Sequence, residues 1–346
     1  MVNRPVHGPT TILGGGSWGT AIAASLARHE EDVRIWSIEA DVVESINTTQ
    51  RNPRYLKDAK LPTGLRATGD VEEALEGTSA IVLAVPAKFT GDVVRSTRPH
   101  APDDAPWVLL GKGLEKGTGR RLSQVALDQP GMRQDLVFAF LGPSHAEEVV
   151  QGQPTAIVLA GPHGDTRAFL QHRMSGPGLR VYTNDDLAGV EMAAAVKNVL
   201  AIAAGMGDGL GLGDNGKGAL LTRGVAELAR LGIAFGGKRE TFFGLAGIGD
   251  MVTTCLSQHS RNRRFGELIA QGRTVQQSLD EIGQVVEGMD TTRTVVELAD
   301  ARGVPVPIAR EVASVLFDGK DPGAALDDLM QRSLKGEWDD APPELD

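Results

Sequence analysis

Residues 10–19 read TTILGGGSWG, and the expected architecture of the first half of the chain follows from this stretch. The run Thr10–Leu13 predicts a short buried strand, and the glycines after it have the spacing G-x-G-x-x-G where a helical pattern begins. In that setting Gly14 permits a tight turn, Gly16 lets the backbone approach a pyrophosphate, and Gly19 allows close packing of helix on strand. Because the helix N-terminus then presents free N–H groups to phosphates, the stretch predicts a dinucleotide-binding unit.

Outward from this turn, short apolar runs alternate with helical periodicity up to about residue 160, which is typical of a parallel sheet wrapped by helices. The predicted strands are Thr10–Leu13, Val33–Trp36, Ala80–Val85, Trp107–Gly111, Leu136–Leu141 and Thr155–Leu159. We therefore expect an α/β fold in which the N-terminal domain is a Rossmann-type doubly wound sheet.

Beyond about residue 186 the strand signals stop and helical patterns take over. The predicted helices are Ala188–Ala204, Ala219–Leu231, Arg261–Gln271, Thr274–Ile282, Thr291–Arg302 and Ile308–Phe317. We expect a dinucleotide-binding domain at 1–187, an all-helical substrate and catalytic domain at 188–336, and a disordered acidic tail at 337–346.

The composition disfavours several classes of protein. A length of 346 residues predicts two domains, at roughly 100–200 residues each. The formal net charge of −10 disfavours broad binding to nucleic acid or anionic lipid. A single cysteine, histidines without metal-ligand spacing and no export signal lead us to expect a cytoplasmic protein without a metal ion. The longest weakly charged stretch, 188–206, contains Glu191 and Lys197, so we expect no membrane span.

Glycine is in excess, with 43 residues in a chain of 346, against a usual fraction of about 7%. Many glycines lie in five short segments, 14–19, 111–119, 205–218, 244–249 and 283–288. We expect these segments to surround a site at which the backbone approaches a dinucleotide and a small phosphate compound.

One lysine stands in an unusual place. Residues 189–206 read GVEMAAAVKNVLAIAAGM, a helix that is apolar nearly all round, so Lys197 is expected to be buried. A lysine in a pocket has a tunable pKa and can serve as acid or base on a substrate oxygen. The alternative is a lysine that snorkels or pairs with Glu191. Asp250, which ends an uncharged run, could anchor Lys197 or cap the helix that follows it.

Two further basic features are candidates for binding an anion. Lys112 follows a predicted strand between two glycines, and the carboxyl ends of such strands face the binding crevice. The segment 260–266, SRNRRFG, opens a helix with Ser260 as its expected N-cap. Its Ser and Asn side chains, the helix N-terminus and up to three guanidinium groups together favour a phosphate. The alternatives are a solvated loop lysine and a solvated basic face.

Discrimination between NAD and NADP is expected at the end of the second strand, where an acid would bind the ribose 2′-OH and an arginine would favour a 2′-phosphate. Glu39 lies near that point but could also start the next helix, and Arg34 lies within the strand. The choice stays open, with a leaning toward NAD or dual use.

Eight motifs together carry a family resemblance: GGGSWGTA (14–21), VPA (85–87), GKGLE (111–115), GPSHAEEV (142–149), AVKNVLAIAAGMGDGLGLGDN (195–215), GLAGIGDMVTTC (244–255), SRNRRFG (260–266) and GQVVEG (283–288). On these motifs the chain resembles the bacterial NAD(P)-dependent glycerol-3-phosphate dehydrogenase family over about residues 10–335. Many members of that family have His or Arg in place of Ile38, at a position that lines the adenosine ribose.

The resemblance implies reversible reduction of dihydroxyacetone phosphate to sn-glycerol 3-phosphate by NADH or NADPH, a reaction that supplies the backbone of glycerophospholipids. It implies that Lys197 donates and accepts the proton, and Asp250 is expected to hold it. The implied substrate-binding residues are Lys112, Gly142, Ser144, Lys197, Asp250, Ser260, Arg261 and Asn262. The expected cofactor-binding residues are Gly14, Gly16, Ser17, Trp18, Gly19, Lys112, Ala146, Arg261, Val286 and Glu287.

Two other functions stay open. The first is a β-hydroxyacid or 6-phosphogluconate type of dehydrogenase, which usually spaces its lysine and asparagine as K-x-x-N, whereas Lys197 and Asn198 are adjacent here. The second is a dinucleotide-binding sensor without catalysis, against which the presence of Lys197 and Arg261 argues. The chain is also compatible with a homodimer.

Overall fold

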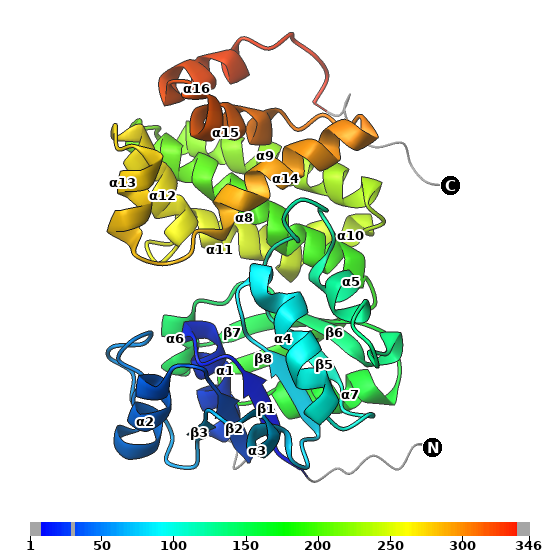
Figure 1. The fold of residues 1–346 in the computed structure, drawn as a ribbon. Helices are drawn as coiled ribbons and strands as arrows, with labels where there is room; N and C mark the ends of the chain where they lie inside the picture. Colours follow the sequence, from blue (N-terminus) through cyan, green and yellow to red (C-terminus); the bar gives the residue numbers. More distant parts are fainter. Residues whose placement is uncertain (1–7, 29–31, 338–346) are drawn as a thin grey trace. The chain divides into compact units, whose positions relative to one another are not determined.

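The structure is a computed structural model that describes residues 8–28 and 32–337 (Figure 1). The chain divides into two compact units. The sheet unit contains the residues up to Gly111 together with Leu122–Leu187, and the helical unit contains Lys112–Arg121 together with the residues from Ala188 onward. Apart from Glu337, the predicted acidic tail lies outside the described residues.

The sheet unit is built on an eight-stranded sheet with the order β3-β2-β1-β4-β5-β6-β7-β8. The strands are β1 Thr10–Leu13, β2 Val33–Trp36, β3 Arg66–Thr68, β4 Ala80–Leu83, β5 Trp107–Leu109, β6 Val137–Leu141, β7 Thr155–Ala160 and β8 Leu179–Asn184. Neighbouring strands are parallel except for the antiparallel pair β6 and β7. The predicted Rossmann-type sheet is confirmed, but the sequence did not predict β3, β8 or the antiparallel pair.

Helices accompany the strands of this unit: α1 Ser17–Ala27, α2 Ala40–Thr49, α3 Val71–Leu75, α4 Thr90–Thr97, α5 Leu122–Leu127, α6 Ala146–Val150 and α7 Asp165–Met174, with short 3-10 turns η1 Ala87–Phe89, η2 Arg98–His100 and η3 Gln134–Leu136.

Both faces of the sheet are covered, because alternate strand residues belong to different hydrophobic cores. Ile12 lies in a core with residues of α1, α2, α6 and α7. Its neighbour Leu13 lies in a second core with residues of α3, α4 and α5. The same alternation separates Val82 from Leu83 in β4. Because both faces of the sheet are apolar, polar chemistry is expected at the ends of its strands.

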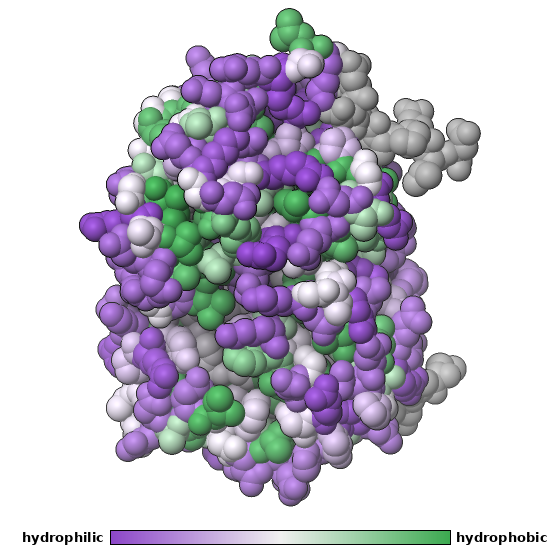
Figure 2. All heavy atoms as spheres, turned by 45° about the horizontal axis from the view of Figure 1, so that its top comes forward, coloured by the Kyte–Doolittle hydropathy of each residue, from purple (hydrophilic) through white to green (hydrophobic). Residues whose placement is uncertain are grey.

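The helical unit is built around α8 Leu187–Gly209, which supplies many buried residues of its core. The other elements are α9 Asp214–Ala234, α10 Arg239–Phe242, a π-helical turn η4 Leu245–Gly249, α11 Asp250–Leu256, α12 Arg261–Ala270, α13 Val275–Ile282, α14 Glu287–Arg302, α15 Pro307–Asp318 and α16 Pro322–Met330. By length and hydropathy α8 could cross a membrane, but 83% of its most apolar window is buried inside the protein, as in a core helix. On the face that Figure 2 shows, hydrophilic side chains surround scattered hydrophobic ones.

Two glycines of this unit have a role other than the one expected for the glycine excess, which was to let the backbone approach a ligand. A Cβ on Gly205 of α8 would lie 1.8 Å from the carbonyl oxygen of Arg263, and a Cβ on Gly266 of α12 would lie 2.0 Å from that of Ile202. These two glycines therefore allow α8 and α12 to cross with their backbones in contact. Some of the excess glycines thus serve close packing between helices and not a binding site.

The segment Lys112–Arg121 belongs to the helical unit although it lies in the chain between β5 and α5. Leu114 is buried in the core around α8 and forms a β-bridge with Arg121. Arg121 in turn pairs with the buried Glu191 of α8 at 2.9 Å. These contacts fix the segment, and with it Lys112, on the helical unit.

Candidate active site

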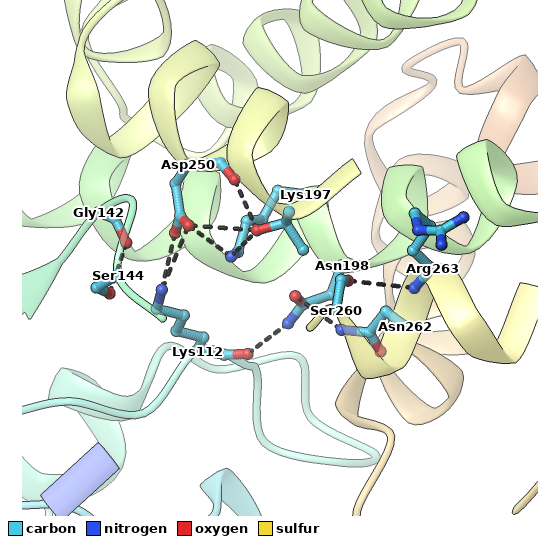
Figure 3. A network of polar contacts seen from close by, with 10 residues as sticks. Lys112, Gly142, Ser144, Lys197, Asn198, Asp250, Ser260, Asn262 and Arg263 are labelled. Carbon is cyan, nitrogen blue, oxygen red and sulfur yellow. Dashed lines mark hydrogen bonds and ion pairs between the residues drawn. The ribbon is translucent and has the colours of Figure 1, made fainter. Parts of the chain in front are cut away.

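The centre of the site is an ion pair inside the helical unit (Figure 3). Lys197, only 3% exposed in α8, donates from Nζ to Asp250 Oδ1 at 2.7 Å and to Thr254 Oγ1 at 2.6 Å. Asp250 and Thr254 lie one turn apart on α11, so a single helix face supplies both acceptors. Asp250 itself is 1% exposed. The predicted burial of Lys197 is confirmed, and its partner is Asp250 rather than Glu191.

The environment of Lys197 changes its acidity. Burial lowers the pKa of Lys197 from 10.5 to about 8, while Asp250 raises it and the positive charge of Lys112 lowers it. Desolvation is the largest of the three causes because it disfavours the ammonium form. A lysine with a pKa near neutrality can donate a proton in one direction of a reaction and accept it in the other.

Lys112 completes the charged group from the segment after β5. Its Nζ lies 3.3 Å from Asp250 Oδ1 and 3.1 Å from Oδ2, so one carboxylate holds two ammonium groups. The Lys112 side chain is 16% exposed, against 4% for Lys197, so it is the more accessible cation. With both lysines protonated the trio carries one net positive charge, which suits an anionic substrate or a developing alkoxide.

A chain of amides joins Lys112 to the helices around it. Asn198 Nδ2 donates to the carbonyl oxygen of Lys112 at 3.0 Å, and Asn262 Nδ2 donates to Asn198 Oδ1 at 3.0 Å. Asn262 Oδ1 accepts from the backbone N–H of Gly288 at 3.0 Å. The sequence left two roles open for Asn198, orienting the substrate or capping a neighbouring loop. It missed Thr254, although the i,i+4 spacing from Asp250 was a usable signal.

The basic cluster of α12 contains fewer available cations than the sequence indicates. Arg263 is paired with Asp208, and Arg264 is paired with Glu267 at 3.1 Å and with Glu281 at 2.9 Å. These carboxylates neutralise two of the three guanidinium groups. The sequence predicted up to three guanidinium groups for a phosphate, and these ion pairs narrow that number to one, because long-range acidic partners were not visible in the local motif.

Arg261 is the remaining cation of the cluster. Its Nη1 donates to the carbonyl oxygen of Val285 at 3.0 Å, and no carboxylate among the described residues pairs with it. Ser260 is the N-cap of α12, as predicted, and its hydroxyl accepts from the backbone N–H of Arg263 at 3.2 Å. Ser260, Arg261 and Asn262 thus form the start of one helix, where backbone N–H groups and one unpaired guanidinium favour an anion.

The glycine-rich turn of the sheet unit fits a pyrophosphate. Gly14 has a φ of +120°, which residues with a side chain rarely adopt, and a Cβ on Gly19 would lie 2.2 Å from the carbonyl oxygen of Gly14. A Cβ on Gly16 would meet nothing within 4 Å, so space is open beside the backbone there. The first turn of α1 has neither a side-chain cap nor an acidic residue. Its N–H groups are left for a phosphate.

The other predicted site residues lie on both units. In the sheet unit Gly142 follows β6 with a φ of +151°, Ser144 Oγ donates to the carbonyl oxygen of Gly142 at 2.9 Å, and Ala146 begins α6. In the helical unit Val286 is the N-cap of α14, and Glu287 is its first residue. In the part of the chain that the structure describes, no group of three or more His, Cys, Asp or Glu could hold a metal ion.

Comparisons with known proteins agree over nearly the whole chain. The family model of the N-terminal part of NAD-dependent glycerol-3-phosphate dehydrogenase matches residues 9–166, and the model of its C-terminal part matches residues 186–327. The chain is 45% identical over 331 residues to glycerol-3-phosphate dehydrogenase (NAD(P)+) of Geobacillus thermodenitrificans, covering 95% of this chain and 96% of that protein. The crystal structure of glycerol-3-phosphate dehydrogenase from Coxiella burnetii is similar with a TM-score of 0.89 and 40% identity, covering 95% of this chain and 100% of that one.

Proposed function

The chain belongs to the NAD-dependent glycerol-3-phosphate dehydrogenase family, and from this we propose that it interconverts dihydroxyacetone phosphate and sn-glycerol 3-phosphate with NADH or NADPH. The observation that carries the proposal is the buried trio in which Asp250 holds both Lys197 and Lys112. Such a trio provides a proton and a positive charge at one place, and reduction of a ketone bearing a phosphate needs both.

Lys197 is the proposed acid and base. When bound, the nicotinamide cofactor would supply the hydride for reduction of the substrate carbonyl. The Lys197 ammonium gives a proton to the C2 oxygen of dihydroxyacetone phosphate, which thereby becomes the alcohol. Asp250 favours the ammonium form of Lys197 before that transfer. In the opposite direction the neutral amine of Lys197 takes the hydroxyl proton. Lys112 adds a second positive charge that stabilises the developing alkoxide.

The phosphate of the substrate is proposed to bind at the start of α12. Arg261 is the cation of that cluster without a carboxylate partner among the described residues, and Ser260 and Asn262 flank it. Anchoring a group that does not react holds the carbonyl in position for the transfer. The proposed substrate-binding residues are Lys112, Gly142, Ser144, Lys197, Asp250, Ser260, Arg261 and Asn262.

The cofactor is proposed to bind through the glycine-rich turn and α1, with its pyrophosphate beside Gly16. The proposed contacts are Gly14, Gly16, Ser17, Trp18, Gly19, Lys112, Ala146, Arg261, Val286 and Glu287. Most cofactor contacts therefore lie in residues 1–187 and most substrate contacts in residues 188–336. The exceptions are the substrate contacts Lys112, Gly142 and Ser144 and the cofactor contacts Arg261, Val286 and Glu287.

The proposal also covers the metabolic role, the cellular location and the oligomeric state of the enzyme. The product is the backbone of glycerophospholipids, so the enzyme would supply lipid synthesis. We propose a cytoplasmic enzyme, consistent with the single cysteine. A homodimer is part of the proposal, and its test is the molecular mass in solution.

An assay of the purified full-length protein tests the proposed function. Oxidation of NADH and NADPH is followed with dihydroxyacetone phosphate, and reduction of both oxidised cofactors is followed with 6-phosphogluconate, each against a control without substrate. The expected result is rapid oxidation with dihydroxyacetone phosphate and none above the control with the sugar acid. Turnover of 6-phosphogluconate alone would favour the alternative dehydrogenase. Cofactor binding without any turnover would favour a sensor.

A further inference from the structure

The carboxyl end of β2 carries a carboxylate that two hydroxyl groups hold in place. Ser37 Oγ donates to Glu39 Oε2 at 2.6 Å, and the Tyr55 hydroxyl donates to Glu39 Oε1 at 3.0 Å. Glu39 is also the N-cap residue of α2, but its side chain makes no capping hydrogen bond. The helix therefore does not use this carboxylate, and each oxygen can still accept a further hydrogen bond.

This carboxylate lies beside the glycine-rich turn. The backbone N–H of Gly14 donates to the carbonyl oxygen of Trp36 at 2.9 Å, which joins the turn to the end of β2. A Cβ on Gly15 would lie 2.7 Å from Ser37 Oγ. The fully buried Asn52 donates from Nδ2 to the carbonyl oxygen of Gly15 at 2.8 Å, three residues before Tyr55. One loop therefore organises both the turn and the position of Glu39.

Among the described residues, no positively charged side chain forms an ion pair with the Glu39 carboxylate. Arg34 of β2 donates to the backbone carbonyl oxygens of Glu73 and Glu76 at 3.1 and 2.8 Å. Arg54 lies over the Tyr55 ring but pairs with Asp41 at 3.2 Å. The residue between Ser37 and Glu39 is Ile38, which is 80% exposed and apolar.

We propose that Glu39 makes this enzyme select NADH over NADPH. The carboxylate accepts a hydrogen bond from the 2′-hydroxyl of the adenosine ribose, and it repels a 2′-phosphate because both groups are negative. Ser37 and Tyr55 are positioning residues that hold the carboxylate toward the ribose. This inference rests on the proposed function only in requiring that the glycine-rich turn binds a dinucleotide.

Calorimetric titration of the full-length protein with NADH and with NADPH, in the absence of dihydroxyacetone phosphate, tests the preference directly. The expected dissociation constant is lower for NADH by roughly tenfold or more, because a hydrogen bond to a charged group is replaced by a repulsion. Glu39→Gln removes the charge and is expected to reduce that ratio by roughly tenfold, mostly through tighter binding of NADPH. Tyr55→Phe is expected to weaken NADH binding without the same gain for NADPH.

Glu44→Gln is the matched control, because Glu44 is exposed on the same helix α2 and the substitution changes the charge equally. It is expected to leave the ratio of the two dissociation constants unchanged. Circular dichroism verifies that each variant is folded. Equal or tighter binding of NADPH by the unmodified protein overturns the inference, as does an unchanged ratio in Glu39→Gln. Since the titrations contain no substrate, a failure to reduce dihydroxyacetone phosphate would count against the proposed function and not against this preference.

Discussion

Lys197 Nζ lies 2.7 Å from Asp250 Oδ1, although 53 positions separate the two residues in the chain. Both side chains are nearly inaccessible to solvent, and each offsets part of the cost of burying the other as a charge. Thr254 gives Lys197 a second acceptor, and Lys112 gives Asp250 a second cation. The pair is held from several sides, which keeps the Lys197 amine in one orientation.

Replacing Lys197 by methionine preserves much of the side-chain volume and removes the proton donor. We expect kcat for reduction of dihydroxyacetone phosphate to fall by about 10²–10⁴-fold, the usual contribution of a positioned acid or base. Steady-state kinetics measure the loss, and calorimetry measures NADH binding, which is expected to be unchanged. Near-normal turnover by a folded Lys197→Met protein would contradict the assignment.

The pH dependence follows from the pKa of about 8 for Lys197. Reduction needs the ammonium form, so kcat/KM for dihydroxyacetone phosphate is expected to be level below about pH 8 and to fall above it. Oxidation of glycerol 3-phosphate needs the neutral amine, so its kcat/KM is expected to rise up to about pH 8 and then to level off. Profiles with the same trend in both directions would show that another group controls the proton transfer.

Asp250→Asn removes the carboxylate that raises the pKa of Lys197. The falling limb of the reduction profile is expected to move to lower pH by on the order of one unit, together with a loss of kcat. The pH profile distinguishes this effect from a purely structural one, which would lower activity without moving the limb. Asp92→Asn changes an exposed aspartate of α4 and serves as the control, with no expected shift.

Arg261→Ala tests the phosphate site. We expect kcat/KM for dihydroxyacetone phosphate to fall by roughly 10–100-fold, because a charge-assisted hydrogen bond to phosphate is lost. Dihydroxyacetone, which has no phosphate, is the control substrate. With NADH at saturation, so that any effect of Arg261 on cofactor affinity is removed, it is expected to react equally slowly with both proteins. Arg264→Ala is the control variant, because Arg264 already pairs with Glu267 and Glu281. A similar loss of kcat/KM in both variants would contradict the assignment of Arg261, and not Arg264, to the phosphate.

A substitution at Glu227 tests the stability of the helical unit at a place outside the proposed active site. It is 1% exposed and accepts from the backbone N–H groups of Ile308 and Ala309 at 2.9 Å each, at the start of α15. Glu227→Ala leaves both donors without this acceptor, so the free energy of unfolding is expected to fall by roughly 2–4 kcal/mol. Urea denaturation measures it. Glu240→Ala, at an exposed position of α10, is expected to change stability by less than about 0.5 kcal/mol.

The same residue predicts a pH effect on stability. Burial raises the pKa of Glu227 from 4.5 to about 7, so the folded protein binds the proton more tightly than the unfolded chain does. This contribution to stability is present at low pH and is lost as the pH rises through about 7. Denaturation at a series of pH values is expected to show this slope in the unmodified protein and to show it reduced in Glu227→Ala.

Features that depend on residues close together in the chain were predictable from the sequence. Strands β1 and β2 were predicted with the bounds that the structure has, and Ser260 was predicted as the N-cap of α12. The glycine-rich turn was also readable, because a strand, a turn and a helix N-terminus follow one another within ten residues. Backbone geometry and side-chain periodicity act over such short distances.

Contacts between groups far apart in the chain could not be predicted without the folded structure. Lys197 had two acidic candidates, and folding brings Asp250 to it while Arg121 takes Glu191. Folding likewise neutralises Arg263 and Arg264 and leaves Arg261 without a carboxylate among the described residues. The short strand β3 and the attachment of segment 112–121 to the helical unit depend on partners far along the chain. Local pattern sets where helices and strands form, whereas the pairing of charges follows from packing, because a buried charge requires a partner that only the assembled core can supply.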